Sequence, residues 1–183
     1  MTGEAGGTGA PQREILAHYE EDLLGIPVVL KNAVIREVDA AGDETIEVPD
    51  LDGLTAAVAV ARCRLPVKLA GAELRFFRKA LEMTAREMAE LLDVTPETLS
   101  RWENDAQAIG EAAEKAIRQA VCALLHRRAP AVDYDPAEIV RMRIMRLPPD
   151  KSIEPLVFER VKLKDAGVRT VSREWDLADP LAA

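Results

Sequence analysis

The chain has few of the residues that build metal and cofactor sites. Its 183 residues include two cysteines, Cys63 and Cys122, and two histidines, His18 and His126. The cysteines are far apart in the sequence and lack the paired C-x-x-C spacing of zinc sites. A zinc site built from these four residues is conceivable, but their spacing does not favour one. We therefore expect two ordinary thiols, no metal and no cofactor.

Long apolar runs and catalytic motifs are missing as well. No segment approaches the roughly 18 apolar residues that a membrane-spanning helix needs. Residues 1–12 are rich in glycine and have neither the apolar stretch nor the basic flank of a signal peptide, so they predict a flexible tail. We expect a cytoplasmic protein with no membrane partner. Because the sequence contains no Ser-His-Asp grouping, phosphate-binding loop or paired-histidine motif, we also expect that it is not an enzyme.

What the sequence does have is a core-forming composition and an uneven distribution of charge. Hydrophobic residues make up 48% of the chain, and the formal net charge is -8. Residues 1–67 contain five basic and twelve acidic side chains, whereas residues 126–183 contain eleven basic and ten acidic ones. The acidity therefore lies mainly in the first third, and the remainder can present a locally basic face.

Residues 13–64 predict a small β-rich N-terminal module closed by one helix. Residues 13–27 are typical of a short amphipathic or irregular lead-in. Residues 27–40 show β-branched side chains in partial alternation, with a turn at Lys31-Asn32, and residues 44–50 form a brief strand. The small-residue run 54–63 ends before Pro66 and predicts the closing helix.

Residues 65–128 have the strongest helical pattern. Leu74, Phe77 and Leu81 lie on one face of a first helix. A second helix begins at Thr84 with a capping box completed by Glu87, and its apolar face consists of Met88, Leu91 and Leu92. In a third helix Thr95 is the cap and Pro96 the first residue. A longer helix over 111–127 points Ile117, Val121 and Leu124 inward.

The second and third of these helices fit the spacing of a helix-turn-helix motif. Ala89 is small where the two helices cross, Asp93 occupies the left-handed turn position, and Val94, Leu99 and Trp102 fill the space between them. With its "LSRWEN" ending, this segment resembles the XRE family, which includes lambda repressor and Cro. Asp93 stands where the family usually has glycine, and Ala85 stands where it often has a glutamine that supports the base-reading residues.

A wider resemblance covers about residues 20–125. Residues 69–104 are similar to the DNA-binding half of MqsA-type antitoxins, and the upstream segment is similar to the zinc-free relatives of that group. The resemblance implies double-stranded DNA as a partner and, as an alternative role, neutralisation of a cognate toxin. Members that bind zinc have C-x-x-C pairs, which this chain lacks.

Recognition helices of this type place their N-terminal residues against base edges in the major groove. Arg101 can donate two hydrogen bonds to guanine, Glu97 can accept one from cytosine, and Pro96 can contact a thymine methyl group. The predicted DNA-binding residues are Arg86, Thr95, Pro96, Glu97, Thr98, Ser100, Arg101 and Asn104. Arg86, Thr95 and Asn104 are assigned to phosphates.

Some of these residues have an alternative interpretation. Arg86 could be merely solvated, and Glu97 could repel phosphate instead of reading a base. Arg78 and Glu103 match positions that pair between the first and third helices of XRE domains, and we interpret them as a structural ion pair. Leu99 and Trp102 are expected in the core and not against bases.

Residues 129–183 predict a C-terminal β-hairpin segment. The patterns "IVRMRIMRL" and "LVFERVKLK" alternate, and a returning strand follows, although Asp135 could instead cap a helix. These strands are too small to form a core alone, so we expect them to pair two protomers or to pack against the N-terminal module. Their arginines could bind RNA or DNA, or form a solvated or dimer-interface face, which we favour.

Together these patterns predict an α+β fold: a lambda-repressor-like helix-turn-helix domain (65–128) between the N-terminal module (13–64) and the C-terminal β extension (129–183). The predicted function is a homodimeric, sequence-specific transcriptional regulator on a palindromic operator, because one short recognition helix reads only a few base pairs. The alternative is an antitoxin that neutralises a toxin and regulates its own operon.

Overall fold

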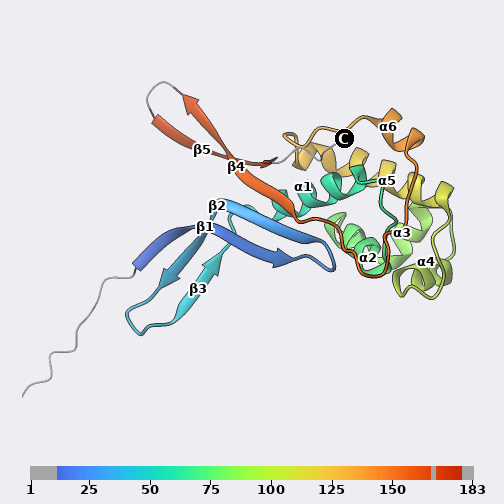
Figure 1. The fold of residues 1–183 in the computed structure, drawn as a ribbon, viewed down its shortest axis with the longest axis horizontal. Helices are drawn as coiled ribbons and strands as arrows, with labels where there is room; N and C mark the ends of the chain where they lie inside the picture. Colours follow the sequence, from blue (N-terminus) through green and yellow to red (C-terminus); the bar gives the residue numbers. More distant parts are fainter. Residues whose placement is uncertain (1–11, 166–167, 179–183) are drawn as a thin grey trace, which may run out of the picture.

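The computed structural model describes residues 12–165 and 168–178, with a sheet at one end and helices at the other (Figure 1). The strands are β1 (Gln12–Asp22), β2 (Pro27–Val38), β3 (Glu44–Glu47), β4 (Leu156–Asp165) and β5 (Val168–Leu177). The helices are α1 (Leu51–Arg64), α2 (Gly71–Ala80), α3 (Ala85–Leu91), α4 (Pro96–Glu103), α5 (Glu111–Leu125), the short 3-10 helix η1 (His126–Arg128) and α6 (Pro136–Arg141). The α+β class is therefore confirmed. Residues 1–11, most of the expected tail, lie outside the described residues.

Both ends of the chain contribute strands to one mixed sheet. β2 pairs antiparallel with β1 along its length, parallel with β4 over Val28–Lys31, and antiparallel with β3 over Ile35–Val38. β4 in turn pairs antiparallel with β5. The C-terminal strands thus pack against the N-terminal ones within the protomer, which is one of the two arrangements expected for them.

The N-terminal segment is more regular than the sequence predicts. The expected irregular lead-in over 13–27 is wrong, because most of it is the strand β1. The expected turn at Lys31-Asn32 is also wrong: β2 continues through it, and Asn32 has φ 50°. Between Leu16 and His18 of β1, the partner strand advances from Val34 to Lys31, so one extra residue forms a β-bulge. Asparagine tolerates this left-handed conformation better than most residues. Because asparagine is common in turns for the same reason, the sequence at Lys31-Asn32 resembles a turn.

Helix α1 is the centre of the core. Its residues from Ala56 to Ala61 are fully buried, since small side chains let neighbours approach from every side. α1 contacts α2 and α5, and also β4 and β5. Asp50 caps α1 by accepting a hydrogen bond from the Gly53 N–H at 3.2 Å, and the buried Trp175 of β5 donates to the Asp50 carbonyl at 3.1 Å. The helix expected to close the N-terminal module therefore also supports the helix-turn-helix.

Two other expectations about the helices need correction. The helical period predicts Leu91 and Leu124 in the core, but they are 43% and 47% exposed. Ala89 and Leu125 are the buried residues near these positions. The strand expected from residue 139 onward begins instead as helix α6, with Asp135 accepting from the Ala137 N–H at 2.8 Å, as in the helical alternative.

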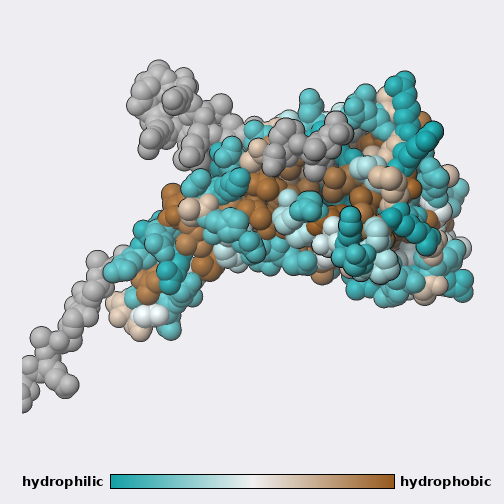
Figure 2. All heavy atoms as spheres, viewed as in Figure 1, coloured by the Kyte–Doolittle hydropathy of each residue, from teal (hydrophilic) through white to brown (hydrophobic). Residues whose placement is uncertain are grey.

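Apolar residues gather across the middle of the face shown in Figure 2, where the sheet meets the helices. Inside the core, Cys63 of α1 and Cys122 of α5 are buried and free, and they contact each other. Burial is the main cause that raises the pKa of Cys63, followed by the hydrogen bond with Cys122. The described residues contain no group of three side chains suited to a metal ion, and no described helix is long and apolar enough to cross a membrane.

Candidate nucleic-acid interface

Helices α3 and α4 and the turn between them form the candidate interface. Thr84 accepts from the Glu87 N–H at 3.2 Å, and the Glu87 carboxylate accepts from the Thr84 N–H at 2.7 Å, so the predicted capping box is present. The hydrogen bond from the Thr84 N–H, followed by the one from the Thr84 hydroxyl, lowers the pKa of Glu87. In the turn, Asp93 has φ 52°, as its position requires, and the Val94 N–H donates to the Ala89 carbonyl at 3.0 Å. The α3 C-terminus is thereby closed, and the chain is turned toward α4.

Helix α4 begins as the sequence predicts. Thr95 accepts from the Thr98 N–H at 3.2 Å, and Pro96 occupies the first helical position. The Thr95 and Thr98 hydroxyl groups also lie 3.1 Å apart. Because these bonds fix the first turn of α4, they fix the residues that would approach base edges.

The buried side of α4 holds it in the domain. Leu99 and Trp102 are buried, as expected, and Arg78 of α2 donates to both carboxylate oxygens of Glu103 at 2.6 and 2.9 Å. The expected ion pair is therefore confirmed. This bidentate contact raises the pKa of Arg78.

The predicted DNA-binding residues lie on the opposite, open side. Exposed side chains are those of Arg86, Thr95, Pro96, Glu97, Ser100, Arg101 and Asn104, whereas Thr98 is half-buried. No hydrogen bond or ion pair holds the Arg101 guanidinium to another of the described residues, so it can turn toward a base. The backbone and Thr95 hydrogen bonds, with Arg101 nearby, lower the pKa of Glu97 and keep it ionised.

All three predicted phosphate-binding residues have protein partners, since Thr95 bonds to Thr98 and both Arg86 and Asn104 contact other residues. Arg86 is 83% exposed and donates to Glu90 at 2.8 Å, which raises the pKa of Arg86. A phosphate would have to displace Glu90. Asn104 donates to the Ser100 carbonyl at 2.8 Å and accepts from Arg75 at 2.8 Å, so its amide also finishes α4.

Arg75 is a further candidate DNA-binding residue, which the sequence analysis did not identify. It lies on α2, three residues before Arg78, and its guanidinium contacts the Glu103 carbonyl at 3.1 Å beside the end of α4. Its side chain is 39% exposed. The three-residue spacing between Arg75 and Arg78 could have identified it, because residues three apart lie on the same face of a helix.

The N-terminus of α2 makes a close backbone contact with the end of α4. The Gly71 N–H donates to Asp105 at 2.8 Å, and a Cβ at Gly71 would lie 2.5 Å from the Trp102 carbonyl oxygen. Only glycine leaves room for this approach.

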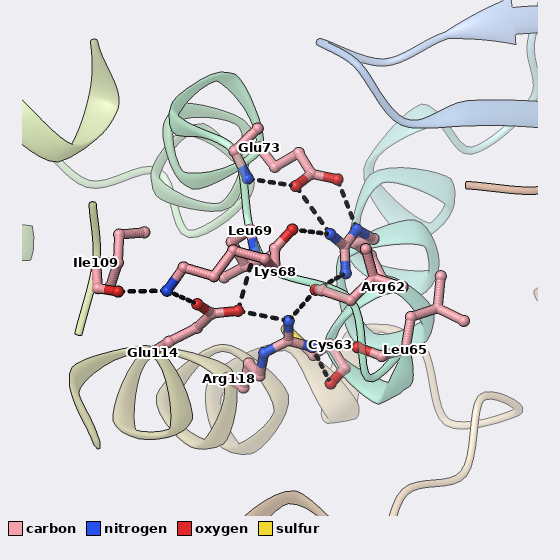
Figure 3. A network of polar contacts seen from close by, with 11 residues as sticks. Arg62, Cys63, Leu65, Lys68, Leu69, Glu73, Ile109, Glu114 and Arg118 are labelled. Carbon is pink, nitrogen blue, oxygen red and sulfur yellow. Dashed lines mark hydrogen bonds and ion pairs between the residues drawn. The ribbon is translucent and has the colours of Figure 1, made fainter. Parts of the chain in front are cut away.

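A buried network of charges fixes the linker between α1 and α2, and Figure 3 shows its members converging from three helices. Arg62 of α1 forms a bidentate pair with Glu73 of α2 at 2.6 and 2.9 Å. Arg118 of α5 donates to Glu114 at 2.7 Å and to the carbonyls of Leu65 and Val67, both at 2.6 Å. Because linker carbonyls and helix side chains share the same arginines, the start of α2 is held against α1 and α5.

Comparison with known families matches residues 74–112 to the family model described as Helix-turn-helix. The match includes most of α2, all of α3 and α4, and the first residues of α5. No curated protein and no solved structure matches the chain. Residues 74–112 are therefore a helix-turn-helix of the XRE type, the kind of unit found in DNA-binding regulators.

Proposed function

We propose that the protein is a sequence-specific transcriptional regulator, acting as a repressor or autoregulator on a palindromic operator as a homodimer. The observation that carries this proposal is the exposed first turn of α4, with Arg101 turned away from a core that holds Leu99 and Trp102. The proposed activity is binding without catalysis. A cytoplasmic location is part of the same proposal.

The homodimer is supported by the small size of the surface that would contact bases and by exposed apolar side chains on α5 and α6. One short helix contacts only a few base pairs, so a second copy is needed for a specific site. α5 and α6 pack against each other and carry Leu124 and Val140, which are 47% and 55% exposed. Light scattering of the Leu124→Glu, Val140→Glu double variant tests whether this surface joins two protomers.

The function is tested by selecting bound sequences from a random DNA pool with purified protein. Arg101→Ala should then lose specific binding to the selected site by roughly tenfold or more, because a bidentate guanine contact contributes about 1–3 kcal/mol per protomer to discrimination. Its melting temperature should stay unchanged, since Arg101 is exposed. Failure to enrich any sequence argues against the regulator, whereas unchanged affinity in the variant removes only Arg101.

An antitoxin role is the second candidate, and the acidic arm supports it. We define this arm as residues 12–22 and 34–47, which contain two arginines and nine carboxylates. Among the described strands β1 pairs only with β2, so its outer edge is open to another chain (Figure 1). Such a surface suits a basic protein partner.

This role can be tested by co-expression with any small reading frame next to the gene. A toxin should co-purify with the full chain and be lost from the Glu20→Lys, Glu21→Lys variant, whose charges on β1 are reversed. If the toxin still co-purifies with that variant, and the variant still binds its operator, the acidic arm is not the toxin-binding surface.

A further inference from the structure

A cavity of about 760 Å³ lies against one face of the sheet, away from the candidate nucleic-acid interface. The sheet contributes His18 of β1, Val29 and Lys31 of β2, and Val157 of β4. The other wall is the segment that leads into β4, together with Leu65 and Val67 of the linker after α1. We call this cavity the sheet groove; its remaining lining residues are Leu147, Lys151, Ser152, Ile153, Glu154, Pro155 and Leu156.

The lining of the sheet groove suits a small organic molecule. Most of its side chains are apolar, with a few polar groups among them, and its volume falls in the range of ligand pockets, about 300–1,000 Å³. It also shares Val67, Leu147, Ser152 and Ile153 with a neighbouring cavity of about 470 Å³ that reaches the loop after α4. None of the eight predicted DNA-binding residues lines either cavity.

The charges of the sheet groove are unlike those of the protein as a whole. Lys31 and Lys151 line it, and neither forms an ion pair with any other described residue. Glu154 is the one carboxylate among its lining residues, and Glu159 lies opposite Lys31 in the strand register. His18 contacts Glu20 at 2.9 Å.

The neighbouring cavity adds Arg146, which also lacks an ion-pair partner among the described residues. Among its other charged lining residues, Arg62 pairs with Glu73 and Lys68 pairs with Glu114, whereas Asp105 forms no ion pair with a described residue and accepts only from the Gly71 N–H. Three cations without an ion pair, Lys31, Lys151 and Arg146, therefore line the two cavities with two such carboxylates, Glu154 and Asp105, in a chain of net charge -8. This local excess favours an anion.

We propose that the sheet groove binds a small carboxylate with an apolar body, of the kind represented by a medium-chain fatty acid. The apolar floor between β2 and the segment before β4 takes the hydrocarbon, and Lys31 and Lys151 attract the carboxylate. Residues 1–11 do not match this chemistry, because Glu4 is their only charged residue and Met1 their only large apolar one. Nucleic acid does not match it either, since the floor is apolar.

The test uses the full chain and two anionic probes: the fluorescent sulfonate 1-anilinonaphthalene-8-sulfonate and decanoate below its micelle concentration. The sulfonate should bind saturably and be displaced by decanoate. Decyltrimethylammonium, which has the same chain length and the opposite charge, should not displace it. Absence of saturable binding, or equal displacement by the cation, would overturn the proposal in favour of a non-specific apolar surface.

Two variants place the binding in the sheet groove. Lys31→Glu with Lys151→Glu should weaken decanoate binding by roughly tenfold or more, because two attractive charges become repulsive. The matched control, Arg127→Glu with Arg143→Glu, makes the same change in charge at residues outside both cavities and should bind normally. Val157→Trp should block both probes by filling the groove. Equal losses in the control, or normal binding by Val157→Trp, would refute the site. Operator binding is measured separately, so absence of ligand binding in the sheet groove would not contradict the proposed regulatory function.

Discussion

The contact between Gly71 and the end of α4 gives the sharpest test of how α4, the proposed recognition helix, is held in place. A Cβ at position 71 would lie 2.5 Å from the Trp102 carbonyl oxygen and 2.7 Å from the Glu103 carbonyl carbon and oxygen, whereas ordinary contacts are 3.4–4 Å. All three atoms belong to the backbone, so no side-chain rotation can relieve the clash. Gly71→Ala must therefore move the start of α2 away from the end of α4 by about 0.9 Å.

The cost follows from two opposing terms. Overpacking of this kind typically costs about 1–3 kcal/mol. Alanine restricts the unfolded chain more than glycine does, which returns about 0.4–1 kcal/mol. The net loss in the free energy of unfolding should be about 1–2 kcal/mol, or roughly 2–8 °C in melting temperature for a chain of this length. Affinity for the selected operator should fall as well, because α4 no longer sits where its first turn reaches the bases.

Urea unfolding and thermal melting measure the stability, and operator binding is measured at a temperature where the variant is fully folded. Gly110→Ala is the matched control, since nothing lies within 4 Å of a Cβ there. Its poorer helix cap and its stiffer unfolded chain nearly cancel, so its stability should change by less than about 0.5 kcal/mol. If Gly71→Ala and Gly110→Ala are indistinguishable in both assays, the contact between Gly71 and the backbone at Trp102 and Glu103 does not hold α4 in place.

Substitutions at three further positions, two of them with a matched control, test other parts of the domain. Arg86→Ala should weaken binding to all DNA sequences alike. It should reduce the salt slope by about 1.8 for the homodimer, if each of its two Arg86 side chains neutralises one phosphate. Titrations at several salt concentrations measure this slope, and an unchanged slope would mean that Arg86 contacts only solvent. Trp102→Ala should lower the free energy of unfolding, measured in urea, by about 3–5 kcal/mol. Trp102→Phe should lower it much less, because it keeps an aromatic ring. It also removes a buried Nε1–H that has no hydrogen-bond partner among the described residues. Glu114→Gln should cost about 3–5 kcal/mol by leaving the buried Arg118 without its counter-charge, whereas Glu111→Gln, on the same helix but exposed, should cost less than about 1 kcal/mol. Equal effects of these last two variants would contradict the importance of burial.

The sequence predicts the helix-turn-helix closely because its signals are local. A capping box at Thr84, a proline after the Thr95 cap and a left-handed residue at Asp93 each act within a few residues. Hydrogen bonds of this kind join residues within about one turn of each other, so the sequence pattern and the structure agree. The ion pair between Arg78 and Glu103 was predictable only through the family resemblance, since it joins two helices.

The sheet was less predictable because its pairing is non-local. β1 is mostly exposed, and its sequence "QREILAHYEED" lacks the apolar alternation of a half-buried strand. β2 is buried on both faces over Val28–Leu30, which also removes the alternation. That β4 lies beside β2, more than a hundred residues earlier in the chain, follows from no local pattern. The exposed Leu124 likewise fits the helical period of α5, but the packing leaves it outside the core.

The buried charges bear on where the DNA-binding part of the chain begins. Arg62 belongs to α1, yet its guanidinium pairs with Glu73 of α2 and with carbonyls of the linker. Arg118 binds the same linker from α5. A helix-turn-helix fragment that starts at residue 65 would leave Glu73 buried without its counter-charge, which is strongly unfavourable. It would also remove α1, against which α2 and α5 pack. The physical unit that supports α4 therefore includes α1, and through Trp175 and Asp50 it extends to β5, near the other end of the chain.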